Sequence, residues 1–312
     1  KLKSQNTAII ILSQLYPGFS KKFDSQIKNQ VYYQVETLVF GDAIKRALKP
    51  ERFIIGSKNI KIQNKYYLNL LNKFKCPILN MNYQSAEFTK IAINLFLISS
   101  TMTTNLLCRL SEKIDFDWES ISSSLKLDRR IGKYAYINPG LGLSGGNLER
   151  DLVATEKLLK KNKIDESLIK SWKKISNERK YWISNKISQL SKKINIKNVS
   201  MLGLSYKIDT DSIKNSPAIF TIIKNPNIIF NCNDPKVKFD KIQRFQNVKI
   251  FELKKCVTKS KIILIATPWP DYFNFFNKNK HMLKNKILID PFNCLKQLKK
   301  LPVLKRYVLG KK

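Results

Sequence analysis

Two polar side chains, Lys90 and Asn94, are spaced for chemistry on a single hydroxyl group. The surrounding residues predict one long amphipathic helix over 85–112, and side chains four positions apart leave the same face of a helix. An amine and an amide on one face suit a base and a hydrogen-bond donor that grip one hydroxyl. A solvated helix face explains the spacing equally well, so the pattern alone leaves both interpretations open.

A glycine-rich loop over residues 139–146 contains a literal G-x-G-x-x-G, from Gly140 to Gly145. A dinucleotide fingerprint needs a strand before it, a helix after it, and a second strand that ends in an acidic residue about twenty positions later. Here the following segment is predicted to be helical and leads into another helix, so Asp165 and Glu166 end no strand. The context therefore argues against a dinucleotide site in this loop.

Metal and disulfide chemistry find no support in the sequence. The five cysteines are widely spaced without a C-x-x-C pair, and His281 is the one histidine. Zinc sites need closely spaced ligand pairs, and disulfide frameworks need paired cysteines in a secreted chain. We expect no metal site, and reduced thiols in a cytoplasmic protein.

The net charge of +35 is compatible with a polyanionic partner such as nucleic acid. Only nine of the 58 basic residues are arginine, and the lysines are scattered along the whole chain. Phosphate-reading surfaces concentrate arginine and interleave aromatic residues. A polyanion-binding protein is therefore a minor alternative.

No membrane anchor or secretion signal is expected. The most apolar stretch, 91–107, is interrupted by serine, threonine and asparagine, whereas a membrane span needs about 20 predominantly apolar residues. The first residues, KLKSQNTAIIIL, contain a short apolar run without a small-residue cleavage site, and they lack an initial Met.

Three stretches of chain must position the candidate residues. Residues 7–81 carry short apolar runs between turns, typical of part of an α/β layer. Residues 82–194 are predicted to be helical, with a second long helix over 166–193. From residue 195 onward apolar runs alternate with helix-like pieces, which predicts a second α/β domain with a parallel sheet. The strand-like runs are 199–204, 228–231, 248–251, 262–266 and 287–289.

Read with its flanks, the glycine loop is similar to the active-site loop of the UDP-glucose/GDP-mannose dehydrogenase family. Residues 128–132, DRRIG, resemble D-x-R-I-G, and residues 139–151, PGLGLSGGNLERD, resemble P-G-x-G-F-G-G-S-C-F-x-K-D. Further segments resemble the family in the same order: the proline turn at 13–18, P-E-F-L-x-E-G-x-A-I and P-D-R at 36–44 and 50–52, A-E-x-x-K-x-x-x-N at 86–94, and the C-terminal domain at 203–207, 210–211, 216–217, 234–235 and 267–269. The resemblance covers essentially the whole chain.

The resemblance implies an α/β protein that oxidises a nucleotide sugar, such as UDP-glucose, at C6 with NAD. It implies the C-terminal part of a Rossmann-like NAD-binding domain at 1–82, a central all-α dimerisation domain at 83–194, and a Rossmann-like UDP-sugar-binding domain at 195–312. The chain would begin inside the first domain, without the glycine turn that seats the NAD pyrophosphate. The expected partners are a UDP-sugar and a second copy of the chain, and neither a membrane nor nucleic acid is expected.

The resemblance also assigns roles to residues. Lys90 and Asn94 would hold the sugar hydroxyl and the developing oxyanion, while Glu36 and Asp151 would assist hydrolysis of a thioester. Arg130 would reach the nucleotide sugar of the neighbouring subunit. The other substrate-binding residues implied are Gly140, Gly142, Leu143, Tyr206 and Lys207, and the cofactor-binding residues are Ser13, Gln14 and Lys214. A surface charge or a tight loop is the alternative explanation for each.

Several departures from the family pattern point to lost chemistry. Asn147 stands where the family has its nucleophilic cysteine, and an amide cannot form the thioester that the second oxidation needs. Gln14, Phe40, Phe292 and Lys214 replace a threonine, a glutamate and two arginines. Loss of a nucleophile costs on the order of a million-fold in rate. We therefore expect an activity that is lost or limited to one hydride step, with a non-catalytic sugar-nucleotide-binding dimer as the alternative.

Overall fold

A computed structural model describes residues 7–38 and 41–311, so the replacement at Phe40 lies outside the described residues. The chain forms two compact units, divided after residue 96. The division falls inside the long helix α4 (Tyr83–Ser111). The predicted domain boundaries at residues 82 and 194 stay predictions.

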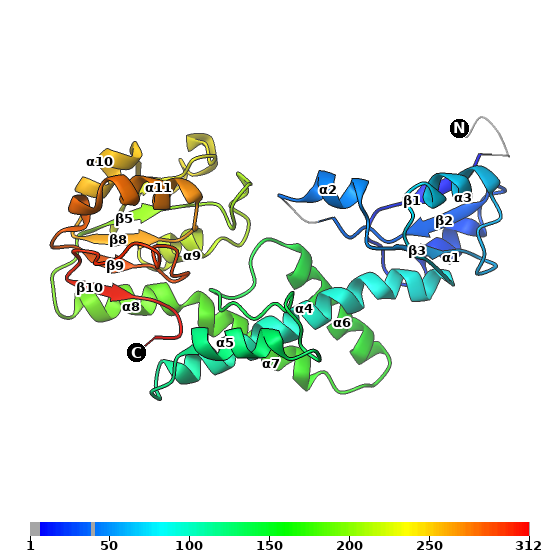
Figure 1. The fold of residues 1–312 in the computed structure, drawn as a ribbon, viewed down its shortest axis with the longest axis horizontal. Helices are drawn as coiled ribbons and strands as arrows, with labels where there is room; N and C mark the ends of the chain where they lie inside the picture. Colours follow the sequence, from blue (N-terminus) through cyan, green and yellow to red (C-terminus); the bar gives the residue numbers. More distant parts are fainter. Residues whose placement is uncertain (1–6, 39–40, 312) are drawn as a thin grey trace. The chain divides into compact units, whose positions relative to one another are not determined.

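The first unit is built on a four-stranded sheet (Figure 1). Its strands lie in the order β1 (Ile9–Ile11), β2 (Val31–Gln34), β3 (Phe53–Gly56) and β4 (Ile78–Met81). The outer pairs are parallel, while β2 and β3 are antiparallel. The short apolar runs of the sequence therefore form a mixed sheet.

Helices cover both faces of this sheet. Helix α1 (Phe19–Asp24) and the first turns of α4 pack on one face, and α3 (Lys65–Asn72) packs on the other. A Cβ atom on Gly56 would lie 2.7 Å from the Cβ atom of Ala86, so α4 lies this close to β3 only because residue 56 is glycine. A short helix, α2 (Ala43–Leu48), follows the undescribed pair of residues.

The 29-residue helix α4 agrees closely with the helix predicted over 85–112. By length and composition alone it could cross a membrane, although more than a third of its apolar window is buried within the protein. The core helix of a soluble protein meets the same criterion. The expectation that the protein has no membrane partner therefore stays a prediction.

The prediction of one helix over 166–193 is wrong. Two helices occupy this stretch, α7 (Ser167–Lys180) and α8 (Trp182–Ser191), and they break at Tyr181. Neither proline nor glycine marks the break. Tyr181 itself keeps near-helical backbone angles, φ −77° and ψ −9°. Its ring packs edge-on against Phe220, with the ring centroids 4.8 Å apart, a tertiary contact that local propensity does not report. The other helices of this region are α5 (Trp118–Leu127) and α6 (Asn147–Lys161).

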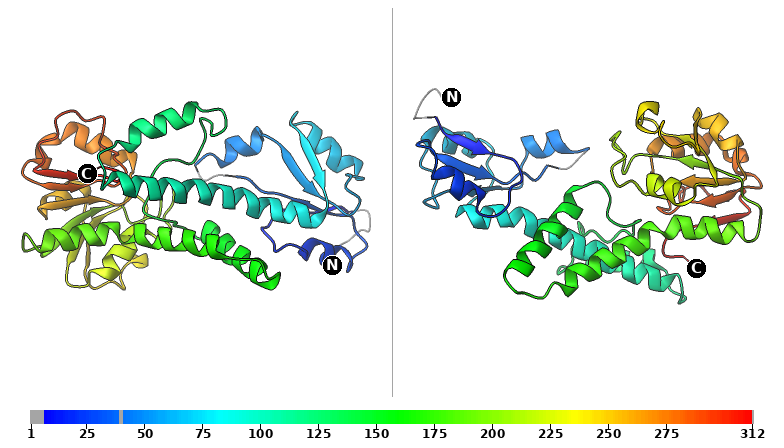
Figure 2. Two further views of the ribbon diagram at one scale, coloured as in Figure 1. Left: turned by 90° about the horizontal axis from the view of Figure 1, so that it is seen from below. Right: turned by 180° about the vertical axis from the view of Figure 1, so that it is seen from behind.

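The second unit contains a six-stranded, wholly parallel sheet, as the sequence predicted, and Figure 2 shows it from two further sides. The strands are β5 (Asn198–Leu202), β6 (Ile229–Asn233), β7 (Val248–Ile250), β8 (Ile262–Ile265), β9 (Ile287–Ile289) and β10 (Lys305–Tyr307). Their spatial order, β7-β6-β5-β8-β9-β10, is that of a doubly wound Rossmann sheet, which confirms the predicted fold class.

Helices lie on both faces of this parallel sheet. Helices α8 and α9 (Pro217–Lys224) contribute to the core on one face, and α10 (Leu253–Thr258) and α11 (Pro270–Lys278) to the core on the other. Two short 3₁₀ turns, η1 (Phe239–Lys241) and η2 (Lys280–Leu283), complete the unit. The chain reverses direction across the sheet between β5 and β8, where doubly wound folds bind their ligands.

Candidate functional site

The carboxyl ends of β5 and β8 lead into two loops that contact each other at this reversal point. Gly203 follows β5 with φ +94°, and a Cβ atom there would lie 2.4 Å from the Cβ atom of Thr267, which follows β8. The hydroxyl of Thr267 donates a hydrogen bond of 2.6 Å to the carbonyl oxygen of Ser205. Only glycine at position 203 permits the two loops to come this close.

A carboxylate after the neighbouring strand β6 fixes the same loop. Asp234 Oδ2 accepts hydrogen bonds from the backbone amides of Leu204, at 2.7 Å, and Ser205, at 3.0 Å. The same oxygen lies 3.3 Å from the indole Nε1 of Trp269. Asp234 lies within the matched segment 234–235, but the resemblance gave it no role. Its position, an acidic residue just after a buried strand, was the signal that could have identified it.

Tyr206 and Lys207 extend from this fixed loop side by side. The Lys207 ammonium lies 5.6 Å from the centroid of the Tyr206 ring. Partial burial lowers the pKa of Lys207, opposed by the negative charge of Asp209, and burial raises the pKa of Tyr206. A partly desolvated cation gains more from an anionic ligand than a fully hydrated one does.

The glycine loop docks on the segment that follows Tyr206. The Gly145 amide donates to the Lys214 carbonyl at 3.2 Å, and Asn215 Nδ2 donates to the Gly145 carbonyl at 2.9 Å. Added Cβ atoms would lie 2.9 Å from the Tyr206 ring at Gly145, and 3.0 Å from Lys214 Nζ at Gly146. The structure therefore brings Tyr206 and Lys214, predicted to bind substrate and cofactor, against the end of the glycine loop.

Residue 147 opens helix α6 immediately after this contact. Asn147 is exposed, whereas Asp151, one turn later, is only 2% exposed and lies 3.7 Å from the guanidinium Nε of Arg150. Glu149 bonds Lys180 at 2.5 Å and also pairs with Asn215. The position that corresponds to the family nucleophile is thus an accessible first turn of a helix beside Lys214.

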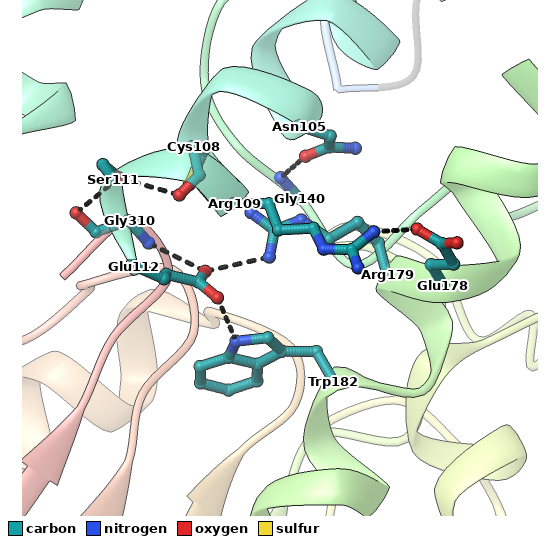
Figure 3. Close-up of polar contacts among 10 residues, drawn as sticks. All are labelled: Asn105, Cys108, Arg109, Ser111, Glu112, Gly140, Glu178, Arg179, Trp182 and Gly310. Atoms are coloured by element: carbon teal, nitrogen blue, oxygen red, sulfur yellow. Dashed lines mark hydrogen bonds and ion pairs between the residues drawn. The ribbon is translucent and has the colours of Figure 1, made fainter. Parts of the chain in front are cut away.

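The first residues of the glycine loop, Gly140 to Leu143, form hydrogen bonds with other parts of the chain. The Gly140 amide donates to Asn105 Oδ1, and the Leu143 amide donates to Ser176 Oγ, both at 2.9 Å (Figure 3 shows the first). A Cβ atom on Gly142 would lie 2.4 Å from the Ser176 carbonyl oxygen, and the Leu143 side chain is buried. The substrate-binding roles of Gly140, Gly142 and Leu143 stay predictions, because the contacts shown are to α4 and α7.

These contacts also test the loop as a seat for a dinucleotide. A pyrophosphate site needs amide groups that point at the ligand, directly after a strand. Here the amides of Gly140, Leu143 and Gly145 bond protein atoms, and no strand lies between α4 and α6 in the described chain. The loop that carries G-x-G-x-x-G therefore lacks the geometry of an NAD pyrophosphate site, which agrees with its predicted helical context.

A polar network lies near the bond between Asn105 and Gly140 of the glycine loop, as Figure 3 shows. The buried guanidinium of Arg179 bonds Glu112 at 2.8 Å, and Glu112 also lies 3.3 Å from Trp182 Nε1 and accepts from the Gly310 amide at 3.2 Å. This network ties α4, α7, α8 and the chain end together. Asn105, which holds Gly140, lies on α4 about two turns before Glu112, the residue that directly follows this helix.

Arg130 lies on an exposed turn and is folded onto its own neighbour. Its Nε and Nη2 atoms bond the two carboxylate oxygens of Asp128 at 3.0 and 2.6 Å. These bonds lower the pKa of Asp128 and raise the pKa of Arg130. The predicted contact of Arg130 with a neighbouring subunit stays a prediction, and it would require the arginine to leave Asp128.

The predicted residues of the first unit gather around α4. Lys90 is half-buried and Asn94 is buried. Glu87, one turn before Lys90, is completely buried and accepts the amides of Gly18, at 2.5 Å, and Ser20, at 2.7 Å. This carboxylate ties the proline turn that carries Ser13 and Gln14 to the helix that carries Lys90. Glu87 was not predicted as a site residue, although the A-E-x-x-K match contained it.

Glu36 lies at the end of a separate segment of the first unit. It follows β2, is half-buried, and accepts the Leu38 amide at 2.6 Å. Its predicted role in proton transfer stays a prediction.

A cavity of about 440 Å³ lies at the carboxyl edge of the parallel sheet in the second unit. Its walls include Trp118 of α5, Pro139 of the glycine loop, and Pro268 and Phe292 after β8 and β9. The volume suits a small-molecule ligand. Phe292, which replaces an arginine of the family pattern, places an aromatic ring where a cation was expected.

Four of the five cysteines are held as neutral thiols, and the described residues contain no cluster of metal-binding side chains. Burial raises the pKa of Cys108 to about 11 and that of Cys256 to about 12, and it also raises the pKa of Cys232 and Cys294. Such thiols carry almost no thiolate at neutral pH. No group of three or more metal-binding side chains occurs in residues 7–38 and 41–311.

Comparison with known proteins agrees with this arrangement. Two models of the UDP-glucose/GDP-mannose dehydrogenase family match the chain, the central domain at 84–179 and the UDP binding domain at 200–297. A UDP-glucose 6-dehydrogenase from Rickettsia bellii is 29% identical over 94% of this chain and 70% of its own length.

Solved structures show the same fold. A UDP-glucose dehydrogenase from Pyrobaculum islandicum superposes with a TM-score of 0.81 at 20% identity, covering 98% of this chain and 71% of the other. A UDP-D-ManNAc dehydrogenase from Pyrococcus horikoshii gives a TM-score of 0.78 at 23% identity, with coverages of 98% and 73%.

Proposed function

This chain belongs to the UDP-glucose/GDP-mannose dehydrogenase family, and on that premise we propose that it binds a UDP-sugar at the carboxyl edge of its parallel sheet. The observation that carries the proposal is the contact of Tyr206 and Lys214 with Gly145 and Gly146. This contact brings the Tyr206 ring, Lys207 and Lys214 close to the backbone of the glycine loop. The residues lie near the point where the chain reverses direction across the doubly wound sheet, where such folds bind ligands.

The chemistry of this edge suits a nucleoside diphosphate sugar. Lys207 and Lys214 supply positive charge for the diphosphate, and the Tyr206 ring supplies an apolar face for a base or a sugar. Asp234 and Thr267 hold the loop in place through hydrogen bonds, so little ordering is needed when the ligand binds. The cavity beside Phe292 lies at the same edge of the sheet, but Tyr206, Lys207 and Lys214 do not line it.

We further propose that the chain does not complete the oxidation of a sugar to an acid. Asn147 opens α6 at the position of the family nucleophile, and its amide forms no covalent intermediate. Lys90 and Asn94 retain the groups for one hydride step by resemblance, whereas the amides of Gly140 and Leu143 in the glycine loop bond protein atoms and form no pyrophosphate seat. We therefore favour a nucleotide-sugar-binding member of the family over an active dehydrogenase.

The second candidate function is a dehydrogenase limited to one hydride step, which the retained Lys90 and Asn94 on one face of α4 favour. A homodimer through the central helices and a cytoplasmic location belong to the same proposal. The apolar side chains that α4 leaves exposed, such as Phe96 and Leu106, support the dimer.

Isothermal titration calorimetry with UDP-glucose and UDP-N-acetylmannosamine tests the binding proposal. We expect saturable binding of one ligand per chain that weakens by about tenfold in Lys207→Ala, because a charge-assisted contact contributes about 1.5–3 kcal/mol. The matched control is Lys278→Ala, an exposed lysine of α11. No heat with either sugar, or equal weakening by both variants, would contradict the proposal. NADH release on addition of NAD would instead favour the one-step dehydrogenase.

A further inference from the structure

A second cavity, of about 770 Å³, lies between helix α8 and the edge strand β10. Its walls include the aromatic side chains of Trp182 and Tyr307 and a single carboxylate, Glu112. Six basic side chains also line it: Lys186, Lys192, Lys193, Lys305, Arg306 and Lys311. Basic residues are thus far more concentrated here than along the chain as a whole.

None of the five lysines of this cavity forms an ion pair within the described residues. Arg306 bonds Asp290 at 2.6 Å, and Glu112 bonds Arg179 at 2.8 Å, so these charges are compensated elsewhere. Across residues 7–38 and 41–311, no carboxylate oxygen lies within 4.0 Å of the ammonium group of any of the five lysines. Lys186 is half-buried and the other four lysines are exposed, whereas the half-buried Lys180 of the same unit has an acidic partner, Glu149.

Two of these ammonium groups converge on one aromatic ring. Lys186 of α8 and Lys305 of β10 each place the Nζ atom 5.3 Å from the centroid of the Tyr307 ring. Burial lowers the pKa of Lys186, and the positive charges of Lys113 and Lys305 lower it further, against the opposing effect of Glu112. The two cations repel each other, as the lowered pKa of Lys186 shows, and an anion bound in the cavity would offset that repulsion.

From this arrangement we infer that the cavity binds a compact polyphosphate anion, a chain of two or three phosphates. Several flexible ammonium groups around one space suit phosphate oxygens, which accept hydrogen bonds from many directions. A ligand with a single carboxylate would leave most of the positive charge of the cavity unbalanced. The residues of the proposed UDP-sugar contacts, Tyr206, Lys207, Lys214 and the glycines of the loop, do not line this cavity. It shares Asn293, Val308 and Lys311 with the cavity of about 440 Å³.

Two sources could supply this chemistry, inorganic tripolyphosphate and a nucleoside triphosphate. Calorimetry with each at 0.15 M salt distinguishes them. Equal affinity means that only the phosphate chain is bound, whereas tighter binding of ATP means that the cavity also contacts the nucleoside. Both results support the inference, and we expect one binding site per chain in either case.

The decisive variant is Lys186→Gln/Lys305→Gln, which removes the two converging charges and keeps side chains of similar length. We expect the affinity for tripolyphosphate to fall by about tenfold or more. The matched control, Lys278→Gln/Lys284→Gln, removes the same charge at exposed positions of α11 and the turn after η2, which pack on the other face of the sheet. Its affinity should change by less than about twofold, since long-range charge is largely screened at this salt concentration.

Three results would overturn the inference. Non-saturable binding, or equal weakening by both double variants, would show that the net charge of the chain attracts the anion without a site. Loss of binding in Lys207→Ala alone would place the anion in the UDP-sugar site instead. Binding of UDP-sugars by Lys186→Gln/Lys305→Gln should be unchanged, so the two proposals succeed or fail separately, and an unchanged Tm would show that the variant is folded.

Discussion

At the scale of single residues, position 147 combines exposure with a helix N-terminus. Asn147 begins α6, so the positive end of the helix dipole and the free amides of the first turn surround its side chain. The same environment lowers the pKa of a thiol. The backbone at this position therefore keeps a setting that would activate a cysteine, although the side chain is an amide.

Replacing Asn147 by cysteine should accordingly create a reactive thiol. We expect the new thiol of Asn147→Cys to react with iodoacetamide at pH 7 at least about tenfold faster than Cys108, Cys232 and Cys256, because burial raises the pKa of those three thiols. Peptide mass spectrometry over a time course would measure the rates. Reaction of the introduced thiol at the rate of a buried one would show that α6 does not activate the position.

Gly132 and Gly145 share a left-handed backbone conformation, so alanine substitutions at the two positions distinguish the cost of backbone strain from the cost of a side-chain clash. Gly132 has φ +85° with no atom near an added Cβ, whereas Gly145 has φ +83° with the Tyr206 ring 2.9 Å away. We expect Gly132→Ala to cost about 1–2 kcal/mol of unfolding free energy from the left-handed backbone alone.

Gly145→Ala should cost more than Gly132→Ala and should also weaken UDP-sugar binding, because the new methyl group displaces Tyr206. Urea denaturation measures the stability of each variant, and calorimetry measures the affinity. Equal costs, with unchanged affinity in both variants, would mean that the contact between the glycine loop and Tyr206 does not shape the site.

At the scale of elements, the pair of Arg179 and Glu112 joins α7 to the residue that directly follows α4. Arg179 is only 3% exposed, and its Nε and Nη2 atoms are buried without a hydrogen-bond partner in the described chain. Removing one member of a buried pair leaves an uncompensated charge. The integrity of the helical region therefore depends on this pair more than on its surface ion pairs.

Glu112→Gln should lower the unfolding free energy by about 3 kcal/mol, in the range typical of a broken buried pair. The matched control is Glu119→Gln, whose ion pair with Lys296 is about half exposed and should contribute less than about 1 kcal/mol. Chemical denaturation of both variants provides the comparison. A smaller loss for Glu112 than for Glu119 would contradict the structural role assigned to the network in Figure 3.

The elements that sequence reasoning found and missed differ in physical origin. β8 and β9 follow from continuous apolar runs, because a strand covered on both faces must be apolar throughout. β10 was missed because its residues, Lys305 to Tyr307, are mostly polar, as an edge strand allows. The contact of Tyr181 with Phe220 and the bond from Asn105 to Gly140 join residues distant in sequence, and no local pattern reports them.

The candidate site was predictable to a similar extent. Tyr206, Lys207 and the glycine loop were identified by resemblance, and the structure shows Tyr206 against Gly145. Asp234 and Ser176 act on the backbone of the two loops, through bonds to amides whose positions only the fold determines. Supporting residues of this kind leave no spacing pattern in a sequence.

At the scale of the whole molecule, helix α4 carries more apolar surface than the described chain covers. Phe96 is 78% exposed, Leu106 is 50% exposed and Leu110 is 45% exposed, all on the same helix. Contiguous exposed apolar side chains on a long helix mark a contact with another surface. A second copy of the chain or a lipid bilayer could cover them, since α4 is also long enough to cross a membrane.

A second copy is the occupant we predict, because α4 contains Lys90 and Arg109 and carries buried polar residues such as Asn94, Asn105 and Glu87 that a bilayer would not accommodate. Leu106→Glu/Leu110→Glu should therefore shift a dimer to a monomer in size-exclusion chromatography with light scattering, while Ile223→Glu, an exposed apolar residue on α9, should leave it unchanged. Stable oligomers of this type bury roughly 2,000 Å² or more, so two charges within the contact should shift the equilibrium strongly. A monomeric parent protein that floats with lipid vesicles, and stops doing so in the double variant, would instead assign this face of α4 to a membrane.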